Sequence, residues 1–250
     1  MTATRDIAWT QIPPTWPAAP AELLGQAKDR ALVSLNPGGR YPVAARLADY
    51  YDADLDYAGA TFAGLAPISP DDVTASDLHA IALLSVDAGP GSTRRLLEPG
   101  ANRTEVLAAL GNVPDTDLLV AGPGTLAAME TLHLAVKSAL SAPTVAHPNA
   151  WVTAAKLCAR KRPELFPVRD REVCGYLGLL NARQNYQVDW HVFRFLIGDQ
   201  DVIAAIGAAV EQTMDVALEG SRRVRPDVSR LRLLDAALWT YKIALNRTVN

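Results

Sequence analysis

Two residues between Trp151 and Val173 have surroundings that suit catalysis. The first, Lys156, lies in the stretch WVTAAKLCAR, where apolar side chains flank it on nearly every side of a predicted helix. A lysine in that position must extend its amine to solvent, pair with a carboxylate or remain desolvated with a lowered pKa. A desolvated amine is a nucleophile that can form a Schiff base. The sequence therefore makes Lys156 a candidate catalytic residue.

Asp170 is the second candidate, because it follows Pro167 and precedes the helical pattern REVCGYLGLL. This position predicts a helix N-cap, whose side-chain oxygen accepts hydrogen bonds from backbone N–H groups. Such bonds and the helix dipole keep a carboxylate ionised at neutral pH. An ionised Asp170 could stabilise an oxocarbenium-like centre or position a water molecule. A purely structural cap explains the same pattern equally well.

Three cations, Arg160, Lys161 and Arg162, end the helix that carries Lys156. One interpretation is structural, since cations in the last turn complement the helix dipole. The other is an anionic partner, because residues 151–250 carry 15 Lys and Arg against 11 Asp and Glu, although the whole chain has a formal net charge of −3. The basic run RRVR at 222–225 has two similar interpretations, a solvated linker or a nucleic-acid contact.

The composition limits the class of protein. The 250 residues are 49% hydrophobic and 20% charged, which is typical of a globular chain. No apolar stretch reaches the roughly 20 residues that cross a bilayer, and the N-terminus lacks the apolar core of a secretory signal. We therefore expect a cytoplasmic protein without a membrane partner.

No pattern in the sequence predicts a metal or a cofactor. The two cysteines and four histidines lack the spacing of metal ligands. The acidic cluster Asp52, Asp54 and Asp56 lacks the turn glycine and the terminal Glu of a calcium loop. We expect this cluster to lie in a solvated loop.

The hydrophobic pattern predicts a mainly α fold. We expect an extended, proline-rich arm over residues 1–20 and a single α-helical domain over 21–250. Helical patterns begin near residues 21, 74, 102, 125, 151, 171, 186, 199 and 231. The segment NPGGR at 36–40 predicts a turn, and it lacks the GxGxxG spacing of a phosphate-binding loop.

Several blocks of the sequence resemble known families. YYDADLDYAGATF, DLHAIALLSV and LRLLDAALWTYK, together with the core ARKRP-x-L-x-P-V-x-D, are similar to an uncharacterised domain family common in actinobacteria. At a greater distance, the core resembles the helix-hairpin-helix DNA glycosylases, in which a helix bearing a lysine leads through a loop to Pro-Val-Asp. Pro167, Val168 and Asp170 match that loop with Arg169 inserted, and Lys156 falls near the Schiff-base lysine.

The glycosylase resemblance implies a helix-hairpin-helix fold with Asp170 as its catalytic carboxylate. The hairpin of that superfamily contains glycines that let backbone amides approach a DNA phosphate. The corresponding segment here, TVAHPNAWVTAAK, contains no glycine.

Three functions are compatible with these features. The first is a glycosylase-like protein that acts on a base of DNA or of a nucleotide, which stacks on an aromatic side chain while cations hold its phosphates. The second is a non-catalytic nucleic-acid or protein binding module on the same scaffold, which the missing glycines favour. The third is a small-molecule enzyme of specialised metabolism. The residues assigned to the site are Asp170 and Lys156 as catalytic groups and Trp151, Trp190, Arg160, Lys161, Arg162 and Arg169 as substrate-binding groups.

Overall fold

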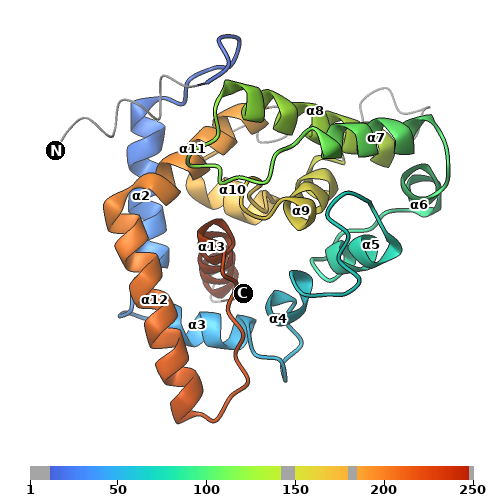
Figure 1. Cartoon of the computed structure of the whole chain (residues 1–250). Coiled ribbons are helices and arrows are strands. Elements are labelled where there is room, and N and C mark those ends of the chain that lie inside the picture. The colour runs from blue at the N-terminus through green and yellow to red at the C-terminus, as the bar shows by residue number, and fades with distance from the viewer. Residues whose placement is uncertain (1–11, 142–149, 180–184, 248–250) are drawn as a thin grey trace. The chain divides into compact units, whose positions relative to one another are not determined.

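The computed structural model describes residues 12–141, 150–179 and 185–247, and these are mainly α-helical (Figure 1). The predicted mainly α fold is confirmed. Within these ranges no β-strand forms, and the one extended pairing is a bridge between Asp52 and Val224. The chain divides into two compact units: unit 1 comprises 1–18 and 64–169, and unit 2 comprises 19–63 and 170–250. The single domain over 21–250 stays a prediction.

Unit 1 contains five helices among its described residues, and α9 packs against two of them. These helices are α5 (Ala75–Ala82), α6 (Pro90–Leu97), α7 (Ala101–Gly111), α8 (Pro123–Leu140) and α9 (Trp151–Lys161). α9 packs against α5 and α8, and α7 packs against α8. Thr74 caps α5 through a capping box with Asp77, where the sequence leaves Thr74 and Ser76 as alternative caps. The cap fixes where α5 begins beside α9.

Unit 2 contains seven helices among its described residues, with α13 at the centre of its packing. They are α2 (Ala21–Ser34), α3 (Val43–Tyr50), α4 (Gly59–Phe62), α10 (Arg171–Leu177), α11 (Tyr186–Gly198), α12 (Gln200–Glu219) and α13 (Arg230–Asn246). α13 packs against α2, α3, α10, α11 and α12, and α3 lies against α12 (Figure 1). All eight residues from Leu231 to Leu238 are buried, Arg232 and Asp235 included. This part of α13 is therefore enclosed on all sides and holds two charged side chains in the interior of unit 2.

Some elements differ from the sequence-based expectations. The patterns do not predict α3, α4 or α6. Two of these helices begin beside a proline: Pro42 precedes α3 and Pro90 opens α6. Residues 1–11 of the predicted arm and residues 144–149 of the glycine-free hairpin lie outside the described residues. Residues 12–18 of the arm belong to unit 1, where Trp16 is buried and its Nε1 donates a hydrogen bond to Glu130 Oε2 at 3.1 Å. None of the described helices has the length and apolar character needed to span a membrane.

Candidate functional site

Lys156 is buried in unit 1, which excludes the alternative in which its amine extends to solvent. It lies in the middle of α9 between residues that are themselves buried, and only 6% of its surface is exposed. Its Nζ donates a hydrogen bond to the backbone carbonyl of Leu84 at 2.7 Å. The amine therefore fills a donor role that joins α9 to the segment after α5.

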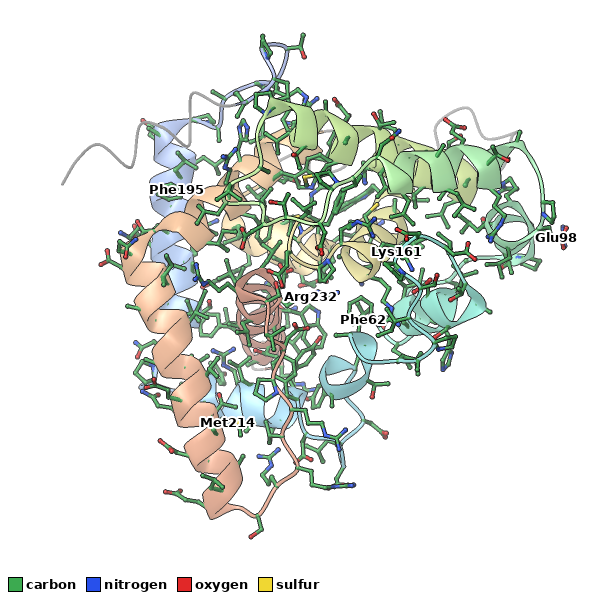
Figure 2. All side chains as sticks on the ribbon, viewed as in Figure 1. Phe62, Glu98, Lys161, Phe195, Met214 and Arg232 are labelled. Carbon is green, nitrogen blue, oxygen red and sulfur yellow. The ribbon has the colours of Figure 1, made fainter. Side chains whose placement is uncertain are left out.

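Arg160 and Lys161, at the end of α9, share one carboxylate. Arg160 Nε donates to Asp77 Oδ1 at 3.2 Å, and Lys161 Nζ donates to Asp77 Oδ2 at 2.9 Å. Arg160 also donates to the backbone carbonyl of Leu65, and Lys161 to that of Ser69. Lys161 is labelled in Figure 2, and both cations are buried. Their charges point into unit 1 and bind the segment that precedes α5.

Arg162, the third cation of this run, is half-buried and also contacts unit 1. Its guanidinium donates to the backbone carbonyls of Pro70 at 2.7 Å and Leu110 at 3.1 Å, and it lies 3.6 Å from Asp71 Oδ1. These bonds support the structural interpretation of the basic run. Substrate binding by these cations stays a prediction.

The two tryptophans assigned to base stacking are buried. In unit 1, the guanidinium carbon of Arg169 lies 5.3 Å from the ring centroid of Trp151, and both side chains are almost fully enclosed. In unit 2, Trp190 on α11 is 1% exposed and packs against Tyr186, with ring centroids 5.2 Å apart. Both rings therefore belong to the packed interior of their units.

Asp170 is the N-cap of α10, as predicted. Its side chain accepts a hydrogen bond from the backbone N–H of Val173 at 2.8 Å, and the residue is 9% exposed. Its charge is felt at Tyr50: burial raises the pKa of the Tyr50 hydroxyl, Arg232 opposes the shift, and Asp235 and Asp170 add to it. Asp170 therefore belongs to a buried group of ionisable side chains in unit 2.

Aromatic rings surround Tyr50 within this group. The centroid of Tyr50 lies 5.0 Å from that of Tyr51 and 5.7 Å from that of Trp239. Arg232 on α13 stacks over the ring of Phe62 on α4, 4.4 Å from its centroid (Figure 2). Asp170 lies in unit 2 and Lys156 in unit 1. Their joint action on one substrate stays a prediction.

The acidic cluster and the second basic run pair with each other in unit 2. Arg222 donates to Asp52 Oδ2 and to Asp49 Oδ1, each at 2.8 Å, and Arg223 pairs with Asp54. The backbone N–H of Asp54, and next Arg222, lower the pKa of Asp52. Asp52 is buried, so the solvated-loop prediction is wrong for this residue. No three His, Cys, Asp or Glu side chains gather as a metal site within the described ranges.

A surface pocket of about 290 Å³ lies in unit 2, where sequence reasoning expects only a turn. The turn between α2 and α3 forms one wall, and the end of α13 forms the other. The lining includes Val33, Gly39, Arg40, Tyr41, Tyr241 and Leu245. The sequence signal was the segment NPGGR followed by Tyr41, but nothing local to it indicates the partner helix about 200 residues later.

Comparison with known proteins gives one family match. A family model described as "Family of unknown function (DUF6308)" matches residues 43–242, a range that includes Lys156, Asp170 and, of the pocket lining, Tyr241. No curated protein and no solved structure matches the chain. The resemblance to DNA glycosylases stays a prediction.

Proposed function

The chain belongs to the DUF6308 family of unknown function, and from that premise we propose that it is a binding module for a small ligand, without chemistry at Lys156 or Asp170. The observation that carries this proposal is the pocket of unit 2, which is open to solvent and lined by aromatic, apolar and cationic groups. Pockets of this kind, with a few polar groups set among apolar ones, are typical ligand sites.

The side chains expected to perform chemistry have structural partners instead. The amine of Lys156 donates to Leu84, and Arg160 and Lys161 share Asp77. A buried donor that leaves its acceptor forfeits a hydrogen bond and exposes a polar group to an apolar interior. Using these groups on a substrate would therefore disrupt the framework of unit 1, which favours binding over catalysis.

A ligand screen with a blocked pocket tests the proposal. Val33 lines the pocket and is 49% exposed, so Val33→Trp fills the space without entering the core. Val120 is 67% exposed in unit 1, and Val120→Trp is the matched control. Bound ligand at about 100 times its Kd stabilises a protein by roughly 2.7 kcal/mol, which a thermal-shift assay detects. Compounds that raise the Tm of the wild type and of Val120→Trp should leave that of Val33→Trp unchanged.

Two outcomes of this screen count against the binding module. One is a small-molecule library in which no compound stabilises the wild type. The other is a set of ligands that stabilise Val33→Trp as strongly as they stabilise the wild type, since such ligands bind elsewhere.

A second candidate function is release of a base from a nucleotide or nucleic acid through Asp170. The observation that favours it is the position of this carboxylate, buried beside the ionisable and aromatic group around Tyr50. Asp170→Asn keeps the N-cap, because Asn caps helices as well as Asp does. If the wild type released free base from modified duplexes and Asp170→Asn did not, the protein would be this enzyme and not a binding module. We expect no release from either protein.

A further inference from the structure

The pocket of unit 2 presents two kinds of surface. Val33 and Leu245 supply aliphatic contacts, and the 49% exposure of Val33 leaves apolar area for a ligand to cover. Tyr41 and Tyr241 supply rings that meet edge to face, with centroids 6.3 Å apart and an interplanar angle of 81°. Edge-to-face and offset geometries are those in which aromatic rings attract one another. This side of the pocket therefore suits a flat aromatic group.

Arg40 supplies the positive charge of the pocket. It is exposed, and its guanidinium carbon lies 5.4 Å from the centroid of Tyr41. Other cations of unit 2, such as Lys28 and Arg222, are paired with aspartates. Over the described part of the chain, by contrast, Arg40 has no carboxylate within ion-pair distance. Its guanidinium remains available for an anionic group on a ligand.

The ring of Tyr241 is held by contacts within unit 2 that need no ligand. Its ring centroid lies 5.6 Å from that of Tyr176 and 5.2 Å from the guanidinium carbon of Arg46. Arg46 is fixed in turn by Thr240 Oγ1 at 2.6 Å and by the carbonyl of Ala237 at 2.9 Å. A wall already ordered in the free protein reduces the entropy lost on binding.

The opposite wall is a turn with a defined shape. Asn36 Oδ1 accepts a hydrogen bond from the backbone N–H of Gly38 at 2.8 Å, and the carbonyl of Asn36 accepts one from Val43 at 3.1 Å. Gly39 has φ +80°, a left-handed conformation that glycine adopts without strain. The two bonds and this glycine place Arg40 at the pocket.

From these contacts we infer that the pocket binds a small planar aromatic ring that carries an anionic group, with Arg40 on the anion and Tyr241 on the ring. The inference rests on the binding function proposed above and names the ligand class for that site. A volume of about 290 Å³ lies just below the range of roughly 300–1,000 Å³ common for ligand sites, which limits the pocket to small ligands. An aromatic carboxylate suits that space, and a nucleoside monophosphate is the larger alternative source of the same chemistry.

Titration calorimetry with defined probes tests the class. The aromatic anions are 4-hydroxybenzoate, indole-3-acetate and adenosine 5′-monophosphate, which separate carboxylate from phosphate sources. Benzyl alcohol keeps a ring without the anion, and acetate keeps an anion without the ring. We expect at least one aromatic anion to bind, and to bind about tenfold or more tightly than benzyl alcohol and acetate, because it makes both contacts.

Variants of the two contact residues locate the binding. Arg40→Gln should raise the Kd of the aromatic anion about tenfold. Arg230→Gln removes an exposed cation at the start of α13 and should leave this Kd unchanged. Tyr241→Phe should keep the affinity and Tyr241→Leu should lower it by a similar factor. Because Arg40 is exposed, its variant reports on binding even where Tyr241→Leu fails to fold.

Three results would overturn the inference: no binding of any aromatic anion, equal affinity for benzyl alcohol, or an affinity unchanged by Arg40→Gln. A different result would contradict the proposed binding function itself. If compounds of another class bind in a manner that Val33→Trp abolishes, the binding module stands and the ligand class is wrong.

Discussion

Asp77 joins two cations that follow one another in the chain, because its Oδ1 and Oδ2 accept hydrogen bonds from Arg160 Nε at 3.2 Å and Lys161 Nζ at 2.9 Å. The three side chains are each 3% exposed or less. A buried ion group is stable only while it is complete, since removal of one member leaves uncompensated charge in the interior. This relationship explains the basic run as the anchor of α5 and of the segment before it.

Loss of the shared carboxylate should destabilise the protein strongly. We expect Asp77→Asn to lower the free energy of unfolding by about 3–5 kcal/mol, the usual cost of breaking a buried ion pair. Asp71→Asn is the control, because Asp71 is exposed and lies 3.6 Å from Arg162, a surface pair worth about 0–1 kcal/mol. Urea unfolding measures both. Equal losses in the two variants would show that Asp77 has no special structural role.

The cap at Asp170 makes a second prediction about stability. Asp170→Ala should lower the free energy of unfolding by about 1 kcal/mol, because the Val173 N–H loses its acceptor. Asp170→Asn should lower the free energy of unfolding by about a few tenths of a kcal/mol at most, since the amide oxygen of Asn accepts the same hydrogen bond. Thermal unfolding of the three proteins checks this order. A loss in Asp170→Asn as large as in the alanine variant would mean that the charge, rather than the cap, is what α10 needs.

Local signals explain which features the sequence could predict. The caps Thr74 and Asp170 are visible because a cap depends on residues within three or four positions of it. The apolar environment of Lys156 is visible because the residues around it belong to the same helix, but the backbone carbonyl of Leu84 that accepts from its amine is not. The exposure of Leu134 in α8 is not visible in the same way: the residue fits the apolar pattern of its helix, but it is 45% exposed, because the helical period alone does not say how wide the covered face is.

Features that depend on distant partners could not be predicted. Arg160 and Asp77 form their contact although they lie 83 positions apart in the sequence, and no local pattern around either residue indicates the other as its partner. The same holds for Tyr41 and Tyr241, which form the pocket together. The sequence therefore left both interpretations of the basic run open, and nothing in it indicated that the turn NPGGR borders a pocket.

Two buried histidines predict a loss of stability in mild acid. Burial, and then the charges of Arg169 and Lys137, lower the pKa of His133 to about 3, and burial with Arg194 lowers the pKa of His191 to about 4. In the unfolded chain both titrate near 6.5. Below that pH the unfolded state binds more protons, so the stability present above pH 6.5 falls as pH drops towards 4. Each histidine contributes up to about 1.4 kcal/mol of lost stability for every pH unit of this fall.

Replacement of His133 isolates its share of this acid sensitivity. Unfolding by urea at pH 7, 6, 5 and 4.5 should give a shallower decline in His133→Gln than in the wild type, because one proton fewer is taken up on unfolding. His79 is exposed, so His79→Gln should leave the decline unchanged. A His133→Gln protein as acid-sensitive as the wild type would refute the assignment.

Two glycines close together in α10 and at its end should respond in opposite directions to alanine. Gly178 has φ +80°, and a Cβ there would lie 2.6 Å from Arg30 Nη1, which donates to the carbonyl of Tyr176. Gly178→Ala should therefore cost about 1–3 kcal/mol, from left-handed strain and a displaced guanidinium. Gly175 has open space around its Cα and helical geometry, so Gly175→Ala should add about 0.5–1 kcal/mol through helix propensity. Denaturant unfolding measures both changes, and a stabilised Gly178→Ala would show that this glycine is not required to end α10.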